Sequence, residues 1–298
     1  MKKILIIGCG LIGSSILRAI NKKKISKKIF VCEKSKKNIL KIKKLKLRCT
    51  ITNDFKNIIP KLDLIIFCTP MSEYEKIILK INKYLSPKTI ITDVGSSKEK
   101  ISKIIKNKLK KGIYWTPGHP ISGSEASGPE FGDKNLFLNK WCILIKDKKS
   151  NKKHLTILTK FWKKIGSKVL IMDLKKHDMI FSITSHLPHL IAYNLVKTAT
   201  DFEKNKKYNL IQFSAGGLRD FSRIAASNEI MWRDIFFNNQ SNIIKGINLF
   251  TKNLRLFKKD IISRNNKSLI KKLVETKKVR KKIIKLKQDI NKPDFGRN

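Results

Sequence analysis

Apolar and polar positions alternate in blocks along the first part of the chain. An apolar, β-branched run at residues 3–7 breaks into a glycine-rich turn, an amphipathic stretch follows to about Ile20, and a second apolar run at 29–32 ends at Glu33. Apolar runs of this length are typical of buried strands, and the amphipathic stretch has the period of a helix. The segment predicts a strand, a turn, a helix, a second strand and an acidic residue, in that order.

The same alternation continues to residue 172. Further strand-like runs lie at 62–68, 89–93, 114–117, 141–145 and 168–172, with helix-like stretches between most of them. Strands that alternate with helices favour a doubly wound, mainly parallel sheet, so we expect an α/β domain over residues 1–172. Ligands bind at the carboxyl ends of such strands, which makes the residues directly after each run candidates for chemistry.

The pattern changes from about residue 173. Helical periods with few strand signals cover four stretches, 177–200, 212–226, 231–257 and 267–287. We therefore expect a second, all-helical domain over residues 173–298.

The turn at 8–13 reads GCGLIG and has the spacing of a dinucleotide-binding motif. Gly8 permits the tight turn, Gly10 lets backbone N–H groups approach phosphates, and Gly13 lets the helix pack closely on the strand. Strand, turn, helix and acid together predict a Rossmann-type domain. The expected cofactor contacts lie in this turn and at the ends of later strands: Gly8, Gly10, Leu11, Ile12, Gly13, Glu33, Thr69 and Pro70.

The choice of cofactor depends on Glu33, which follows the glycines by about 20 residues. Its carboxylate can accept hydrogen bonds from ribose hydroxyls and repels the 2′-phosphate of NADP, which favours NAD. Lys34, Ser35 and Lys36 follow directly and could hold that phosphate, so NADP stays open as an alternative.

Composition narrows the class of protein. The 298 residues are 41% hydrophobic, and no apolar run approaches the ~18 residues of a membrane span. The five cysteines are odd in number and lack CxxC spacing, so we expect reduced thiols of a cytoplasmic protein, with no disulfide framework and no zinc site. No membrane association is expected.

A formal net charge of +45 would, taken literally, indicate nucleic acid as a partner. The lysines, however, are spread over nearly every predicted helix and loop, and aromatic residues are not interleaved with them as a base-stacking surface requires. We interpret the charge as a bias of composition and expect no specific nucleic-acid partner. A positive surface still attracts an anionic substrate.

His119 lies in the segment GHPISGSE, at the end of a predicted strand, and Ser96 follows another strand. A neutral imidazole there can accept a proton from a substrate hydroxyl while hydride leaves the same carbon. Glu125, in the same loop, could orient the histidine or meet the substrate. The alternative is a surface histidine before a proline turn.

Two further constellations lie in the helical part. His186 and His189, three residues apart, share a helix face and would permit metal binding, but no third ligand of convincing spacing accompanies them; pocket lining or core packing is favoured. No metal site is therefore predicted. In the glycine-containing segment at 216–223, Arg223 has the geometry to hold a carboxylate and Asp220 could fix a histidine or an arginine, although a solvated helix turn has the same composition.

Taken in order, these segments resemble one family. The chain reads GCGLIGSSI, DVGSSK, GHPISGSE, SHLPHLIAYN, GLRDFSRIAAS, MWRDIF and, near its end, ETKKVRKKIIK with PDFGR. It is similar to prephenate dehydrogenases, specifically the bacterial prephenate/arogenate (cyclohexadienyl) type of tyrosine biosynthesis. The resemblance covers nearly the whole chain and implies a homodimer built by the helical domain. No chorismate mutase or regulatory segment is recognised at either end, so a monofunctional enzyme is expected.

The resemblance implies an oxidative decarboxylation. NAD(P) takes hydride from the ring carbon that bears the hydroxyl, the ring carboxylate leaves as CO₂, and aromatisation drives the reaction. His119 matches the histidine that accepts the hydroxyl proton, and Ser96 matches the serine that positions that histidine, the hydroxyl and the nicotinamide. Activity should then rise with pH through a pKa near that of histidine.

The same resemblance implies a substrate pocket. His189 matches the pocket histidine, Arg223 with Asp220 beside it matches the arginine that binds a substrate carboxylate, and Glu125 matches an acidic residue associated with pocket closure. Another Rossmann-type 3-hydroxyacid or imino-acid oxidoreductase would share the glycine turn but would not require this set. A non-enzymatic basic binding protein is the alternative from a different class.

Overall fold

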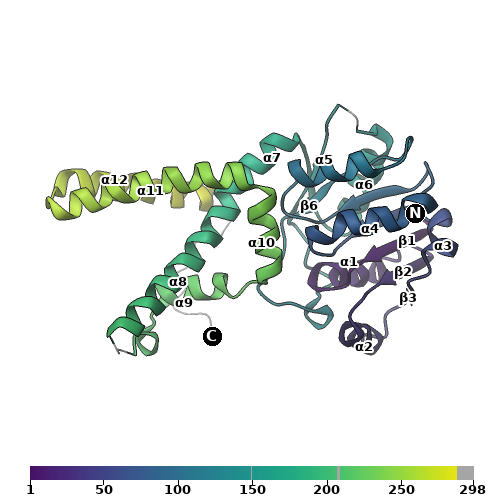
Figure 1. Cartoon of the computed structure of the whole chain (residues 1–298), viewed down its shortest axis with the longest axis horizontal. Coiled ribbons are helices and arrows are strands. Elements are labelled where there is room, and N and C mark those ends of the chain that lie inside the picture. Colours follow the sequence, from purple (N-terminus) through teal and green to yellow (C-terminus); the bar gives the residue numbers. More distant parts are fainter. Residues whose placement is uncertain (149, 207–208, 287–298) are drawn as a thin grey trace.

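The computed structural model describes residues 1–148, 150–206 and 209–286. A sheet-containing part is followed, from α7 onward, by helices that extend away from it (Figure 1). The PDFGR segment near the end of the chain lies outside the described residues.

Five short strands form a parallel sheet, as the alternating pattern predicts. Their spatial order is β3-β2-β1-β4-β5, and all four pairings are parallel. The central strand β1 places Ile4 between Ile29 of β2 and Leu64 of β4. The strands are β1 (Lys3–Ile7), β2 (Lys28–Cys32), β3 (Thr50–Ile51), β4 (Leu64–Phe67) and β5 (Ile90–Asp93).

Helices cover both faces of this sheet, because successive side chains of each strand point to opposite sides. Ile4 and Ile6 belong to a core shared with α1 and α6, whereas Leu5 and Ile7 belong to a core shared with α4 and α5. Burial on both faces explains why the strands are continuously apolar. The covering helices and turns are α1 (Leu11–Lys22), α2 (Lys36–Lys44), α3 (Phe55–Ile58), η1 (Ile59–Lys61), η2 (Met71–Glu73), α4 (Tyr74–Ile81), η3 (Asn82–Tyr84), α5 (Glu99–Lys108) and α6 (Lys152–Lys164).

A second, three-stranded sheet differs from the prediction. β6 (Gly118–Pro120) runs antiparallel to β7 (Trp141–Ile145), which pairs in parallel with β8 (Lys168–Met172). The run predicted at 114–117 contributes only a bridge between Trp115 and Ile91. Pro117 and Pro120 cannot donate backbone hydrogen bonds, which explains why β6 is short. The loop from β6 to β7 contains the turn η4 (Pro129–Phe131).

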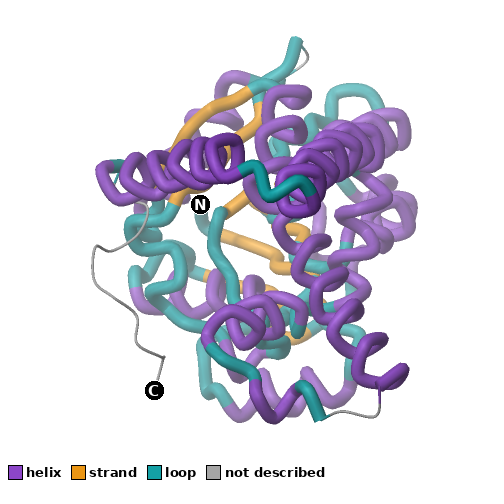
Figure 2. Tube along the Cα trace, turned by 90° about the vertical axis from the view of Figure 1, so that its left-hand side faces the viewer, coloured by secondary structure: helices purple, strands orange, loops and turns teal. Residues whose placement is uncertain are grey.

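The helical part contains six α-helices among the described residues. They are α7 (Leu174–Phe181), α8 (Leu187–Lys206), α9 (Gly216–Ala225), α10 (Glu229–Asn238), α11 (Gln240–Ile262) and α12 (Asn266–Lys285), with the turns η5 (Ser182–His186) and η6 (Ile211–Phe213). Figure 1 shows α11 and α12 as a hairpin that projects away from the sheets. In Figure 2 the helices of this part, drawn in purple and joined by loops, lie in front of the orange strands. Among the described helices, none is both long and apolar enough to cross a membrane.

The observed helices differ in their bounds from the predicted stretches. The stretch predicted at 231–257 is divided by Asn239, whose buried side-chain amide donates to the Asp178 carbonyl oxygen at 2.7 Å and lies 3.0 Å from Nδ1 of His186. These contacts hold the backbone of Asn239 out of helical geometry (φ −113°, ψ 27°). The helix predicted to start at 212 begins instead at Gly216.

A π-helical turn, η5, separates α7 from α8. Pro188 has no N–H to donate to the carbonyl of residue 184, and its ring would meet that carbonyl in a regular helix. A π turn is a common way to accommodate such an interruption and is frequent at functional sites. His186 is the last residue of this turn, and His189 lies in the first turn of α8.

Candidate active site

One cavity of about 1740 Å³ lies between the carboxyl ends of the strands and the helical part. Residues from both parts of the chain form its wall. Most of the predicted site residues line it: Gly8, Gly10, Leu11, Ile12, Glu33, Thr69, Pro70, Ser96, His119, Glu125, His189 and Arg223. Gly13 and Asp220 are the two that do not. Asp220 lies exposed on α9, one turn before Arg223.

The glycine turn joins β1 to α1 at one end of the cavity. Gly8 has a φ of +87°, which a residue with a side chain rarely adopts. A Cβ on Gly13 would lie 2.2 Å from the Gly8 carbonyl oxygen, whereas a Cβ on Gly10 would meet no atom within 4 Å. Gly13 therefore permits close packing of helix on turn, and Gly10 leaves space in front of the α1 N-terminus, where an anion is favoured.

Glu33 is buried at the end of β2, beside this turn. Its Oε2 accepts a hydrogen bond from the Cys9 backbone N–H at 2.9 Å, and its Oε1 accepts one from the Ser35 N–H at 2.9 Å. Each carboxylate oxygen retains further lone pairs. Glu33 thus links the turn to the strand end and faces the cavity, and its predicted contact with a ribose stays a prediction.

His119 lies on β6 in the cavity wall and is only 7% exposed. Its Nδ1 lies 2.9 Å from Nε2 of His177, and its ring packs edge-on against Phe181. Burial lowers the pKa of His119 well below its ordinary value, and the positive charges of His177, Lys98 and His186 would act in the same direction. We therefore expect activity to rise with pH at a lower pH than an ordinary histidine pKa would give.

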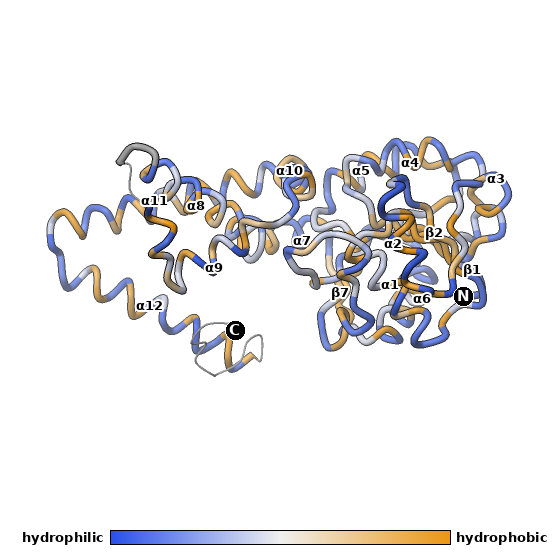
Figure 3. Tube along the Cα trace, turned by 90° about the horizontal axis from the view of Figure 1, so that it is seen from below, coloured by the Kyte–Doolittle hydropathy of each residue, from blue (hydrophilic) through white to orange (hydrophobic). Residues whose placement is uncertain are grey.

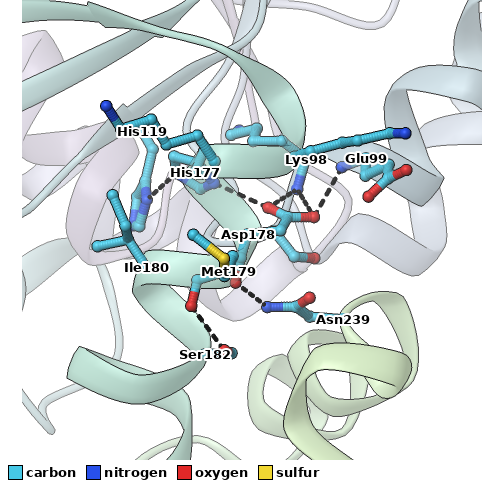
Figure 4. Close-up of polar contacts among 12 residues, drawn as sticks. Lys98, Glu99, His119, His177, Asp178, Met179, Ile180, Ser182 and Asn239 are labelled. Atoms are coloured by element: carbon cyan, nitrogen blue, oxygen red, sulfur yellow. Dashed lines mark hydrogen bonds and ion pairs between the residues drawn. The ribbon is translucent and has the colours of Figure 1, made fainter. Parts of the chain in front are cut away.

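His177 and Asp178, in the middle of α7, were not predicted as site residues. Nδ1 of His177 lies 2.8 Å from Oδ1 of Asp178, so His119, His177 and Asp178 form a continuous chain of contacts (Figure 4). His177 is 58 positions from His119 in the sequence. No local pattern in the sequence indicates that His177 meets His119.

A buried ion pair also lies behind His119. Lys98 Nζ lies 2.6 Å from Asp93 Oδ2, and both side chains are fully buried. The Asp93 carboxylate also accepts from the backbone N–H of Gly95 at 2.9 Å and of Gly118 at 3.2 Å. Asp93 therefore connects the turn that carries Ser96 with the strand that carries the histidine.

The opposite wall of the cavity comes from the helical part. His189 stacks on the buried Trp232 with ring centroids 3.9 Å apart, and its Nδ1 lies 3.0 Å from the Ser185 carbonyl oxygen. His186 is fully buried and contacts Asn239. The two histidines thus have different surroundings, and His189 is the one that lines the cavity.

Arg223, on α9, faces the loop that follows β6. Its Nη1 lies 3.6 Å from Oε2 of Glu125, and both side chains are 39% exposed. This is a partly solvated ion pair of modest strength, so its arginine is available to another carboxylate. A neutral imidazole, an arginine and a glycine turn around one cavity can accept a proton, hold an anionic substrate and place a dinucleotide beside it.

Comparisons with known families cover nearly the whole chain. The family model described as prephenate dehydrogenase, nucleotide-binding domain, matches residues 16–171. The model described as prephenate dehydrogenase, dimerization domain, matches residues 173–279.

Individual proteins show the same similarity. The chain is 31% identical to cyclohexadienyl dehydrogenase of Zymomonas mobilis, over 94% of this chain and 95% of that protein. It is 31% identical to prephenate dehydrogenase of Lactococcus lactis, over 94% of this chain and 77% of that protein. The crystal structure of prephenate dehydrogenase from A. aeolicus, in complex with hydroxyphenyl propionate and NAD⁺, superimposes with a TM-score of 0.88 at 33% identity, over 95% of this chain and 98% of that one.

Proposed function

This chain belongs to the prephenate dehydrogenase family, and we propose that it oxidises and decarboxylates prephenate, arogenate or both, with NAD as hydride acceptor. The products are 4-hydroxyphenylpyruvate from prephenate and tyrosine from arogenate, with CO₂ from either. The observation that carries the proposal is the position of His119, in the wall of one cavity with a dinucleotide-type glycine turn and Arg223. Because the chain belongs to this family, we do not retain the alternative of a 3-hydroxyacid or imino-acid oxidoreductase.

The cofactor site fits NAD. The open space at Gly10 and the α1 N-terminus would receive the pyrophosphate, and Glu33 would meet the adenosine ribose. Thr69 and Pro70 follow β4, on the same side of the cavity. When bound, NAD supplies the acceptor for hydride from the ring carbon that bears the hydroxyl. NADP stays possible through the lysines that follow Glu33.

The remaining chemistry belongs to the protein. His119 accepts the proton of the ring hydroxyl as that carbon becomes a carbonyl-like centre, and Ser96, in the same cavity wall, positions the hydroxyl. Since the imidazole is buried, its neutral form is favoured, as a base requires. Loss of CO₂ is driven by aromatisation of the ring and leaves a phenolate oxygen, to which His119 returns the proton.

The substrate is held from the helical part and the β6–β7 loop. Arg223 binds a substrate carboxylate with Asp220 one turn away, His189 lines the pocket, and Glu125 faces the arginine across the opening. An arginine in a partly desolvated site contributes orientation as well as affinity.

We also infer a homodimer in the cytoplasm. The match of residues 173–279 to a dimerization domain supports the dimer. Apolar side chains of α11 such as Leu254 and Ile262 are exposed, and Figure 3 shows hydrophobic positions along both α11 and α12. The five cysteines are free thiols, which supports a reducing compartment.

The proposal is tested by following NAD reduction at 340 nm with prephenate and then with arogenate. Wild-type protein should reduce NAD with at least one of them, and His119→Asn should lower kcat about 10²- to 10⁴-fold. His154→Gln is the matched control, because His154 is a buried histidine on α6, away from the cavity, and should leave kcat unchanged. Absence of a signal with either substrate, under NAD or NADP, would contradict the proposed function.

A further inference from the structure

Asp178 is held by backbone groups from the other part of the chain. At the N-terminus of α5, the Lys98 N–H donates to Oδ1 of Asp178 at 2.9 Å, and the Glu99 N–H donates to Oδ2 at 2.8 Å (Figure 4). The Asp178 side chain therefore caps a helix of the first domain from α7, which begins the helical part. Asn239 donates to its carbonyl oxygen at 2.7 Å, so both the backbone and the side chain of Asp178 are fixed.

Proton positions along the chain of contacts follow from this anchor. A carboxylate only accepts, so Nδ1 of His177, 2.8 Å from Oδ1 of Asp178, carries a hydrogen. A neutral His177 then has its lone pair on Nε2, and Nδ1 of His119, 2.9 Å away, carries the hydrogen between them. The remaining nitrogen of His119 is Nε2, which is left with a lone pair.

We propose that His177 and Asp178 are positioning residues that fix the tautomer of His119, so that its Nε2 is the atom that accepts the substrate proton. The α5 N-terminus sets the direction of this relay, because it binds the carboxylate at the far end. The inference deepens the proposed function and rests on it for the identity of the proton donor. The assignment of the tautomer itself needs no substrate.

Burial supports the neutral state that this relay requires. His177 is fully buried and His119 is nearly so. Desolvation lowers the pKa of His177 although Asp178 opposes it, and it lowers the pKa of His119 as well. The positive charge of Lys98 lowers the pKa of both histidines in addition and so disfavours a second positive charge there. With both imidazoles neutral, the hydrogen bond to Asp178 fixes which nitrogen carries the hydrogen, first in His177 and then in His119.

The decisive substitution is Asp178→Asn. An amide keeps an oxygen for the α5 N–H groups but directs its NH₂ toward Nδ1 of His177. His177 would then carry its hydrogen on Nε2 and donate to His119, which would place the His119 hydrogen on Nε2 and remove the base. We expect kcat to fall about 10²- to 10⁴-fold with a small change in KM, since wrong-tautomer variants of other histidine relays lose activity to this extent.

A second variant distinguishes a loss of kcat caused by the wrong tautomer of His119 from a loss caused by a general structural change. His177→Gln offers an amide that can rotate to accept from Nδ1 of His119, so it should retain kcat within about tenfold. In that background Asp178→Asn should have little further effect, because the imidazole that transmits it is gone. Equal losses of kcat from Asp178→Asn in both backgrounds would overturn the proposal. His154→Gln serves again as the buried-histidine control.

Histidine ¹⁵N spectra provide a readout that is independent of turnover. The chain contains five histidines, and single substitutions assign their signals. Wild type should show His119 as the Nδ1–H tautomer, and Asp178→Asn should show it as Nε2–H. An Nε2–H tautomer in wild type would overturn the relay even if prephenate is oxidised. The expected tautomers in a protein that oxidises neither substrate would support the relay and contradict the proposed function.

Discussion

Alanine at Gly13 and alanine at Gly10 should affect different properties of the protein. At Gly13 the new Cβ would lie 2.2 Å from the Gly8 carbonyl oxygen and 3.3 Å from Cys68 Cβ. The oxygen belongs to the backbone of a turn at φ +87°, so α1 itself must move by about 1 Å. Overpacking of this kind costs about 1–3 kcal/mol, which should lower the midpoint of thermal unfolding by about 2–10 °C.

At Gly10 no atom lies within 4 Å of the new methyl group, and φ is −74°. The folded chain accommodates it, so the unfolding midpoint without cofactor should stay within about 2 °C of wild type. The methyl group would occupy the space before the α1 N-terminus, where the pyrophosphate should bind. The KM for NAD should therefore rise about tenfold or more.

The assay is thermal unfolding of the cofactor-free protein, followed by the KM for NAD at saturating prephenate. Gly13→Ala should lose stability and cofactor affinity together, whereas Gly10→Ala should lose affinity alone. Equal destabilisation by both substitutions, or an unchanged KM in Gly10→Ala, would refute this reasoning about the turn.

The kcat/KM should be flat from about pH 6.5 upward and fall only at lower pH, because burial lowers the pKa of His119 and the base must be neutral. An inflection at or above pH ~6.5 in initial rates would contradict this. Arg223→Lys should raise the KM for prephenate about tenfold, with a smaller change in kcat, since lysine lacks the bidentate geometry for a carboxylate. An unchanged KM would remove Arg223 from the binding site. Lys98→Met should lower the unfolding midpoint by about 6 °C or more, because a buried Asp93 left unpaired costs about 3 kcal/mol. Adding Asp93→Asn should recover part of that loss, and no recovery would show that the ion pair is not its source.

The fold could be predicted from the sequence wherever burial produces a simple pattern of apolar residues. β1, β2 and β4 are buried on both faces, so each is a continuous apolar run, and the glycines between β1 and α1 mark the turn. The second sheet was harder to predict, because the prolines at 117 and 120 leave β6 only three residues long. The break at Asn239 depends on contacts with Asp178 and His186, which no local pattern contains.

The site was predictable only in part, for the same reason. His119 and Ser96 follow strand-like runs, and the rule that ligands bind at strand ends identifies such positions. His177 lies on α7, and its partner His119 is 58 residues away in the sequence. A single histidine beside an aspartate forms no motif with a distinctive spacing. Lys98 reads as one lysine among many, and only its complete burial against Asp93 distinguishes it.

Lys98 differs from most other lysines of the chain because it is buried, and this difference separates the charges that act on the site from those that act at the surface. The net charge of +45 resides largely in exposed side chains, whose fields are screened within about 10 Å at ordinary ionic strength. Lys98 is fully buried, lies between the carboxylates of Asp93 and Asp178, and disfavours protonation of His119. A few buried groups that join the two parts of the chain therefore favour the neutral form of His119, and the surface charge contributes instead to attracting an anionic substrate.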